Sequence, residues 1–435
     1  MFEKKETQLS KSEIGHTLNT GQVFSHDNEW IVFDHRNNDG DIKITDGIGI
    51  INVNTGEERL IYKVDNQTVH GPGVGAVSFS PVENKVIFIH GIRNAAADKP
   101  YDFTRRTGVA INIKQPQQPI FMDARQIEKP YVIGALRGGT HAHSWSGDGQ
   151  MISFTYNDYV LEQLAKTDPK VKDLRTIGLM FPKKVVVSNP SNLENNDGEM
   201  FSVLAATVTE NPKPGSNEID KAFDECWIGT DGYLKSDGTK QHKAIAFQGN
   251  VKDLNGNTIT EIFVADIAND ITTTSFERIV AGTENTRPAA PKGVTQRRIT
   301  FSKKGATGPR NWLRSSADGS QVFFLSADDK DIVQVYSVSP NGGNIKQITK
   351  NPFSITSPIN ISPDGLYLSY IADQSVFVTE ILTGISQRLT QQYVAPEKLN
   401  GAVVWSNDGR KLAFNRYVKS ENGMFLQIFL LSRPY

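Results

Sequence analysis

The sequence has almost no cysteine and no long apolar run, and both absences narrow the class of protein. Cys226 is the single cysteine among 435 residues, which excludes an internal disulfide and a cysteine-cluster metal site. No apolar stretch approaches the roughly 18 residues that a transmembrane helix needs, so we expect no membrane span. No motif surrounds Cys226, and we expect it to be a buried structural thiol.

The chain also lacks an excess of either charge. It carries 47 Lys and Arg against 48 Asp and Glu, a net charge of −1, which gives no long-range field toward nucleic acid or anionic membrane. We therefore expect no nucleic-acid partner, and we expect a monomer. The start, MFEKKETQLSKSEIG, contains no apolar signal segment. We expect a cytoplasmic protein if the chain is native, and a periplasmic or secreted one if a leader has been removed.

What the sequence does contain is a repeated phrase: a short apolar strand, Ser-x-Asp-Gly or a related turn, and a second apolar strand. Asp and Gly accept turn geometry, and the Ser or Asp side chain can hydrogen-bond to the turn backbone. Four antiparallel strands per unit, repeated radially, are typical of β-propeller blades. The six clear instances are VFSHDNEWIVFD (23–34), VSFSPVENKVIFIH (77–90), HSWSGDGQMISFTY (143–156), RSSADGSQVFFLS (314–326), NISPDGLYLSYIA (360–372) and VWSNDGRKLAFNR (404–416).

The spacing of these units predicts a seventh blade. Ser362 and Ser406 are 44 residues apart, which is the length of a bare blade. The gap between the third and fourth instances is long enough to hold one more blade with insertions. We assign HKAIAFQG (242–249) and TEIFVADI (260–267) to that further blade.

The two ends of the chain predict how the ring closes. The last unit has three strands, and ETQLSK (6–11) resembles the outer strands of other units. An N-terminal strand that completes the last blade would remove an open sheet edge. The predicted fold class is therefore all-β: one seven-bladed β-propeller domain over 1–435, closed by its N-terminal strand. Polar inserted loops are expected at about 158–175, with a short helix, and at about 190–222.

The order of strands within each unit predicts that the candidate site residues lie on one face of the propeller. The Ser-x-Asp-Gly turns join strands one and two, so entries to strand one and loops from strand two to strand three share the opposite face. Loops gathered at one end of a rigid scaffold commonly form sites. Adjacent residues of a strand point to opposite sides, so we expect only one of Arg105 and Arg106 to face the axis. The candidates on this face are Arg36, His70, His90, Tyr101, Arg105, Arg106, Arg137, His141, His143, Tyr156 and Asn157.

These side chains suit β-elimination on a uronic acid. Arginine binds a carboxylate through two parallel hydrogen bonds and neutralises it, so that the neighbouring C5 proton becomes removable. Histidine and tyrosine can take that proton and protonate the leaving glycosidic oxygen. No nucleophile elbow, phosphate loop, zinc-protease or dinucleotide motif occurs at a usable position.

His141 and His143 raise a separate question, because residues two apart in a strand point the same way. Together they supply two nitrogens to a metal, and a third ligand would come from His70, His90 or Asp158. No cofactor is certain on this basis, and Zn, Mn or Ca are the divalent candidates. A metal-dependent hydrolase is thus a third possible activity.

Several stretches resemble a TolB-like bacterial propeller family and, beyond it, the seven-bladed propeller polysaccharide lyases. These lyases are the ulvan lyases and, more distantly, oligogalacturonate lyase. The stretches that carry the resemblance are WIVFDHR (30–36), GVGAVSFSP (73–81), KVIFIHG (85–91), YDFTRRTGV (101–109) and ALRGGTHAHSWSGDGQMISFTYND (135–158).

The resemblance implies roles for particular residues. His70 and His90 match a histidine pair of the ulvan lyases, and Arg137 matches the arginine that those enzymes use against the uronate carboxylate. Their proton-transferring tyrosine is replaced here by Phe121, which leaves that role to another tyrosine or to a histidine. The metal-binding histidine pair of oligogalacturonate lyase resembles His141 and His143, although Gly138 stands where that enzyme has glutamine.

The sequence thus predicts a polysaccharide lyase that cleaves a uronate-containing acidic polysaccharide or oligosaccharide by β-elimination. The alternative is a non-catalytic TolB-like propeller that binds a protein or ligand on the same face. The expected catalytic residues are His70, His90, Arg137 and Tyr156; the expected substrate-binding residues are Arg36, Tyr101, Arg105, Arg106 and Asn157; the expected metal ligands are His141 and His143.

Overall fold

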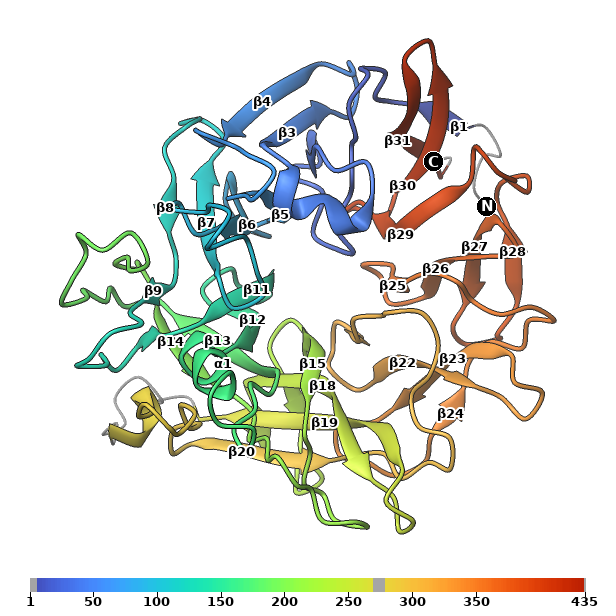
Figure 1. The fold of residues 1–435 in the computed structure, drawn as a ribbon. Helices are drawn as coiled ribbons and strands as arrows, with labels where there is room; N and C mark the ends of the chain where they lie inside the picture. Colours follow the sequence, from blue (N-terminus) through green and yellow to red (C-terminus); the bar gives the residue numbers. More distant parts are fainter. Residues whose placement is uncertain (1–5, 269–277, 434–435) are drawn as a thin grey trace.

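Seven antiparallel sheets surround a common axis (Figure 1), as the repeated turns predict. A computed structural model describes residues 6–268 and 278–433. Within these ranges, no helix has both the length and the apolar character needed to cross a membrane. β1 and β31, the first and last described strands, lie side by side in Figure 1.

The first three blades occupy the N-terminal half of the chain. Blade 1 consists of β2 (Trp30–Asp34), β3 (Gly47–Asn52) and β4 (Glu58–Lys63), with the 3-10 helix η1 (Asp39–Ile44) between β2 and β3. The segment 17–24 lies on the inner side of β2 and is joined to it by two isolated β-bridges, Thr17 to Asp34 and Phe24 to Ile31. Blade 2 consists of β5 (Val74–Phe79), β6 (Lys85–Gly91), β7 (Arg106–Asn112) and β8 (Ile120–Phe121). Blade 3 consists of β11 (Gly139–Trp145), β12 (Ile152–Asn157), β13 (Thr176–Phe181) and β14 (Phe201–Leu204).

The remaining four blades follow the same order. Blade 4 consists of β15 (Ala222–Trp227), β18 (Lys243–Lys252), β19 (Thr258–Ile267) and β20 (Val294–Arg298). Blade 5 consists of β21 (Arg314–Ser315), β22 (Val322–Ala327), β23 (Val333–Val338) and β24 (Lys346–Gln347). Blade 6 consists of β25 (Asn360–Ile361), β26 (Tyr367–Ala372), β27 (Ser375–Glu380) and β28 (Ser386–Arg388). Blade 7 consists of β29 (Leu399–Trp405), β30 (Lys411–Ser420), β31 (Gly423–Ser432) and the N-terminal β1 (Glu6–Gln8).

Short helices and strands occur in the loops between the blade strands. The first expected insertion contains helix α1 (Tyr159–Ala165), capped by Asp158. The second, 190–222, differs from the expectation because it includes β14, whose four residues are all buried and form the outer strand of blade 3. The other short elements are β9 (Ala124–Arg125), β10 (Ala135–Leu136), β16 (Tyr233–Leu234), β17 (Lys240–Gln241) and η2 (Arg278–Ala281).

The predicted turn chemistry is confirmed in the repeated phrase. Ser146 Oγ donates to Asp148 Oδ1 at 2.5 Å, and Ser146 Oγ accepts from the backbone N–H of Met151 at 2.9 Å. Gly149 follows with a φ of 69°, a conformation that favours glycine. The serine–aspartate bond recurs at Ser316–Asp318, Ser362–Asp364 and Ser406–Asp408.

The hydrophobic core is divided among the blade interfaces. The described residues form seven buried apolar clusters, and each cluster lies between two neighbouring blades. Trp145 and Phe154, for example, pack between blades 2 and 3 with relative exposures of 4% and 0%. Every blade is therefore buried on both faces, which fixes its inner strand rigidly around the axis.

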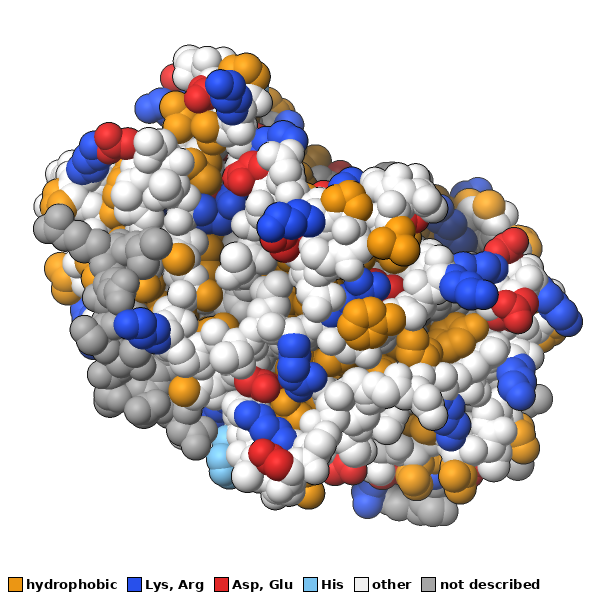
Figure 2. All heavy atoms as spheres, turned by 90° about the horizontal axis from the view of Figure 1, so that it is seen from below, with side chains coloured by type: hydrophobic (Ala, Val, Ile, Leu, Met, Phe, Trp, Pro, Cys, Tyr) orange, Lys and Arg blue, Asp and Glu red, His pale blue; other side chains and the backbone are white. Residues whose placement is uncertain are grey.

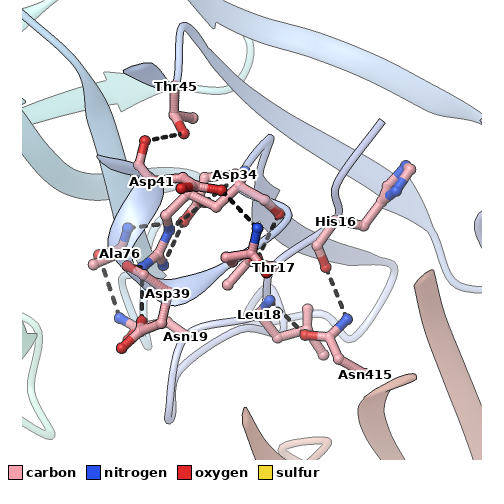
Figure 3. A network of polar contacts seen from close by, with 12 residues as sticks. His16, Thr17, Leu18, Asn19, Asp34, Asp39, Asp41, Thr45, Ala76 and Asn415 are labelled. Atoms are coloured by element: carbon pink, nitrogen blue, oxygen red, sulfur yellow. Dashed lines mark hydrogen bonds and ion pairs between the residues drawn. The ribbon is translucent and has the colours of Figure 1, made fainter. Parts of the chain in front are cut away.

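The N-terminal strand closes the ring, as predicted. β1 pairs with β31 through the register Glu6 to Leu431 and Gln8 to Phe429. Further along, Asn415 of blade 7 accepts from the Leu18 N–H at 2.8 Å and donates to the His16 carbonyl at 2.8 Å (Figure 3). These bonds join the N-terminal segment to the last blade, and β1 covers the outer edge of β31.

The rim of the propeller carries mixed charge. On the side seen in Figure 2, Lys and Arg alternate with Asp and Glu, and neither sign gathers into one field. This view agrees with the net charge of −1. This side of the molecule therefore offers no extended surface of one charge to a charged ligand.

Candidate functional site

A central cavity of about 710 Å³ runs along the propeller axis. Its wall extends from the loops that carry Tyr101 and Phe103 to the opposite turns at Gly147 and Ser362. Aromatic rings, guanidinium groups and short polar side chains alternate along it. A cavity of this size accommodates a small organic ligand.

The structure brings only some of the predicted site residues to this cavity. Those that line it are Arg36, Tyr101, Arg106, His141 and His143. Those that lie elsewhere are His70, His90, Arg105, Arg137, Tyr156 and Asn157. The residues that the resemblance implied as catalytic are thus separate from the cavity wall.

Arg106, the first residue of β7, is a buried cation in this wall, with a relative exposure of 6%. Its guanidinium carbon lies 4.7 Å from the ring centre of Tyr101 and 4.2 Å from that of Phe103. Its Nε is buried without a hydrogen-bond partner, and among the described residues no carboxylate lies within 4.0 Å of it. Burial lowers the pKa of Arg106, although the guanidinium stays charged at neutral pH.

His141 lies beside this cation on β11, at 2% exposure. Its ring centre is 5.9 Å from that of Phe103, and neither ring nitrogen has a hydrogen-bond partner in the described part of the chain. Burial, followed by the positive charges of Arg106, Arg175 and Arg310, holds the pKa of His141 well below its usual value. The imidazole is therefore neutral at pH 7 and has a free lone pair.

Tyr101 completes this group from the loop between β6 and β7. Burial raises the pKa of its phenol to about 12 despite the neighbouring Arg106. The phenol is therefore protonated at neutral pH. An acid, a cation and a neutral base thus line one wall of the cavity, and we call Tyr101, Arg106 and His141 the wall triad.

Arg36 lines the cavity on the blade 1 side, but its charge is already compensated. Its Nε and Nη2 donate to the two carboxylate oxygens of Asp34 at 2.7 and 2.9 Å, and its Nη1 donates to Asp39 at 3.0 Å. Asp34 also accepts from the Ala76 N–H at 2.8 Å, which links blade 1 to blade 2 (Figure 3). This pair therefore stabilises the ring and leaves Arg36 little capacity for a ligand anion.

The prediction that His141 and His143 face one side rests on regular strand geometry, and β11 departs from it. Ala142 between them has a φ of 58°, and the pairing of β11 with β12 shifts between His141 and Ser144. Such a bulge re-aims the side chains that follow it. His143 Nε2 lies 3.1 Å from Thr140 Oγ1, and burial lowers the pKa of His143 to about 3.

The expected metal site lacks a ligand set in this arrangement. Across residues 6–268 and 278–433 there is no group of three or more His, Cys, Asp or Glu that could hold a metal ion. The arginines that depress the pKa of His141 also repel a cation. As placed here, His141 and His143 do not fit a Zn, Mn or Ca site, whereas the charge around His141 favours an anion.

His90 is a buried structural partner at the end of β6. Its Nδ1 lies 2.5 Å from the Gly91 carbonyl, and its Nε2 lies 2.9 Å from the Tyr62 hydroxyl of blade 1. Burial lowers the pKa of His90 to about 4. Its expected partner, His70, is half-buried in the mostly exposed turn that follows β4, where the Thr68 hydroxyl accepts from its N–H at 3.1 Å.

Arg137 and Tyr156 belong to a second buried network, behind the wall of blade 3. Arg137 Nε donates to Asp158 at 2.9 Å, and the Tyr156 hydroxyl donates to the same carboxylate oxygen at 3.2 Å. Arg137 also donates to the carbonyls of Thr283 and Thr286. Nearby, Asn157 bonds Asp173 at 2.7 Å and Arg175 at 3.2 Å. This network anchors the loops that follow β12 and η2.

Arg105 points away from the axis, as the alternation of adjacent residues predicts. Its Nη2 donates to Glu194 and to Asn94, each at 2.6 Å. Arg106 takes the inward direction. The expectation that only one of the two arginines faces the axis therefore matches their placement.

The wall also contains functional groups that the sequence reasoning missed. Arg310, Trp312 and Arg314 line the cavity from the segment that enters blade 5. Arg314 donates to the Thr20 carbonyl at 2.6 Å and to Asn360 at 2.7 Å, and burial lowers its pKa to about 10. The rule that entries to strand one share the site face identifies this segment too, once it is extended beyond the first three blades.

Glu225 is a further missed residue, from the inner strand of blade 4. Its exposure is 1%, Thr155 donates to it at 3.1 Å, and burial raises its pKa to about 7. Asp224 before it has a φ of 50°, so β15 carries the same kind of bulge as β11. No sequence signal marks this position, because the bulge decides which side chain faces inward.

Comparisons with solved structures agree with the fold. An oligogalacturonate lyase in complex with manganese is 11% identical, with a TM-score of 0.55 over 99% of this chain and 93% of that one. TolB from Acinetobacter baumannii is 13% identical, with a TM-score of 0.39 over 98% of this chain and 86% of the other. The predicted resemblance to oligogalacturonate lyase is confirmed as a resemblance of fold.

Sequence comparisons identify relatives. A family model described as "Protein of unknown function (DUF3748)" matches residues 73–195, which span blade 2 and most of blade 3 and contain the wall triad. The Escherichia coli (strain K12) protein YidR, described as uncharacterized, is 34% identical over 414 residues, which cover 94% of each chain. Because this identity extends along nearly the whole propeller, the chain belongs to the YidR family.

Proposed function

We propose that this protein is a lyase that cleaves a small uronate-containing saccharide by β-elimination in the central cavity. The observation that carries the proposal is the wall triad, in which a buried guanidinium without a carboxylate partner lies beside a neutral imidazole and a protonated phenol. A buried cation without a counter-ion is costly. A ligand anion would offset that cost.

In the proposed reaction Arg106 binds the uronate carboxylate. The bound carboxylate is neutralised by the guanidinium, which stabilises the negative charge that develops when the C5 proton leaves. The rings of Tyr101 and Phe103 contact the guanidinium, and these cation–π contacts hold it in the cavity wall. Neutral sugars lack the carboxylate and are expected to be poor substrates.

His141 and Tyr101 transfer the protons. His141 takes the C5 proton with its free lone pair, the C4–O4 bond breaks, and a C4–C5 double bond forms. Tyr101 delivers its proton to the departing O4, and the imidazolium then reprotonates the phenolate. The products are an unsaturated uronate and a shortened saccharide, with no net gain or loss of protons by the protein.

A second candidate function is binding without catalysis, as in a non-catalytic TolB-like propeller. The observation that favours it is that no side chain of the described residues hydrogen-bonds His141 and orients its ring. Catalytic bases are usually held by such a partner. In this case the same anionic saccharide would occupy the cavity unchanged.

An ultraviolet assay for unsaturated uronate tests the proposal. Purified protein is mixed with a panel of acidic oligosaccharides that includes ulvan and pectin fragments, with and without chelator. We expect absorbance to rise at equal rates with and without chelator, and kcat/KM to fall by about 10²-fold to 10⁴-fold in His141→Gln and Tyr101→Phe.

His242→Gln is the matched control, because His242 pairs with Asp231 on a remote turn and should keep full activity. No absorbance change with any saccharide, together with calorimetric binding of the same saccharides, would exclude the lyase and leave the binding function. Equal activity of His141→Gln and wild type would exclude the wall triad as the catalytic group.

A further inference from the structure

A second cavity of about 350 Å³ adjoins the central one on the face that carries the wall triad. The two cavities share Phe103 and Arg310 in their walls. We call the smaller one the side pocket. Its other walls come from Arg175, from strands β15, β18 and β19 of blade 4, from the segment that enters blade 5, and from Leu325 of β22.

The side pocket is lined by three cations and one described carboxylate. Arg175, Lys221 and Arg310 line it, and Asp224 is the acidic residue among its described lining residues. Arg310 Nε lies 3.4 Å from Asp224 Oδ1. Arg175 donates its Nε to the neutral amide of Asn157 at 3.2 Å, and no carboxylate of the described residues lies within 4.0 Å of Arg175 or of the Lys221 ammonium. The pocket therefore carries excess positive charge.

Burial and neighbouring positive charge lower the pKa values of Lys221 and Arg175 in the side pocket. Burial lowers the pKa of Lys221, and the positive charges of Arg175 and Arg310 add to this effect against the attraction of Asp224. Burial and Arg310 likewise lower the pKa of Arg175, against the attraction of Asp224 and Asp173. Three cations that share one described lining carboxylate are incompletely neutralised, and a bound anion would relieve their mutual repulsion.

Phe103 connects the side pocket to the wall triad. The guanidinium carbon of Arg106 lies 4.2 Å from its ring centre, and that of Arg175 lies 5.0 Å from the same centre. One aromatic ring thus contacts both a cation of the central cavity and a cation of the side pocket. Sugar rings pack on aromatic faces, so an exposed ring in this position can support the link between two charged sugar units.

We infer that the side pocket binds a second anionic group of the same ligand, a carboxylate or a sulfate on the sugar unit next to the one at Arg106. This inference rests on the proposed binding of a uronate in the central cavity. It narrows the ligand class to saccharides with anionic groups on two neighbouring units.

Calorimetric titration tests the side pocket, in a Tyr101→Phe background that prevents turnover. Three size-matched disaccharides are compared: one with two carboxylates, one with a carboxylate and a sulfate ester, and one with a single carboxylate. We expect a two-anion ligand to bind at least about tenfold more tightly than the one-anion ligand. The tighter of the two-anion ligands identifies the second group.

Variants locate the second anion. Lys221→Met keeps the apolar stem and removes the charge, so it should weaken the two-anion ligand by about tenfold and leave the one-anion ligand unchanged. Arg175→Met should act in the same way. Lys240→Met, on the hairpin strand β17 outside both cavities, is the control and should change neither affinity. Thermal unfolding of each variant verifies that the propeller is intact.

The outcomes separate the two proposals. Equal affinities for the one-anion and two-anion ligands would show that the side pocket binds no second anionic group. Equal weakening of both ligands by Lys221→Met would show the same. Either result leaves the proposed uronate site at Arg106 unaffected. Failure of all three disaccharides to bind, with the propeller intact, would overturn the proposed function itself. A loss confined to the two-anion ligands in Lys221→Met and Arg175→Met would support the inference.

Discussion

Two arginines line the same cavity on neighbouring blades and have opposite surroundings. Arg36 of blade 1 is held by both oxygens of Asp34 and by Asp39, whereas Arg106 of blade 2 contacts aromatic rings and has no carboxylate partner among the described residues within 4.0 Å. The first arrangement joins strands and loops of the ring. The second leaves charge available to a ligand, which is the arrangement that binding sites require.

The comparison predicts effects of different size on stability. Arg36→Met leaves the fully buried Asp34 without its counter-ion and should lower the free energy of unfolding by about 3–5 kcal/mol. Arg106→Met loses cation–π contacts worth about 1–2 kcal/mol each but also removes the cost of a buried cation without a counter-ion, so it should destabilise the protein less than Arg36→Met. Urea unfolding of both variants at pH 7 measures the difference. Equal destabilisation by the two substitutions would show that Arg106 is structural.

The comparison predicts the reverse for activity. Arg106→Met should lower kcat/KM for the uronate substrate by about 10²-fold to 10³-fold, because it removes the group that neutralises the carboxylate. Arg59→Met is a suitable control, since Arg59 is exposed on the outer strand of blade 1 and pairs with Glu57. Initial rates in the ultraviolet assay provide the measurement. Full activity in Arg106→Met would contradict the proposed role.

A second pair sharpens the contrast: His90, whose two ring nitrogens are bonded, and His141, whose two ring nitrogens are not. His90→Phe leaves the Tyr62 hydroxyl without its partner and should cost about 1–3 kcal/mol of stability. It should leave kcat/KM unchanged, because His90 does not line the cavity. Unfolding curves and initial rates on one preparation test both statements. A large loss of kcat/KM in His90→Phe would show that His90 takes part in catalysis.

The smallest expected effect is that of pH on kcat/KM. The basic form of His141 is lost only below its pKa, which burial and three arginines hold well below 6.5. The acidic form of Tyr101 is lost only near its raised pKa of about 12. The profile should therefore be flat from about pH 6 to about pH 10. An acidic limb near pH 6.5 would indicate a histidine in an ordinary environment and would exclude His141 as the base.

The seven-bladed ring could be predicted because its signal is local. The Ser-x-Asp-Gly turns form their own hydrogen bonds, as at Ser146 and Asp148, so each hairpin is encoded in a few adjacent residues. The four-residue strand β14 was missed because it is short and lies in a polar stretch. The arrangement of blades follows from the chain order alone.

The site was predicted only in part because side-chain direction depends on irregular backbone. The face was predicted from strand order, and Tyr101, Arg106 and His141 of that face do line the cavity. The bulges at Ala142 and Asp224, with φ values of 58° and 50°, have no sequence signature and decide where His143 and Glu225 point. Resemblance to lyases directed attention to His90 and Arg137, which the structure holds in hydrogen-bonded networks outside the cavity.

The most direct test of the central claim is a calorimetric titration of the protein with galacturonate and with galactose, which differ only in the carboxylate. The account predicts that galacturonate binds at least about tenfold more tightly than galactose, and that Arg106→Met removes this difference. Equal affinity of the two sugars for the wild type, or a preference for galacturonate that survives in Arg106→Met, would contradict it.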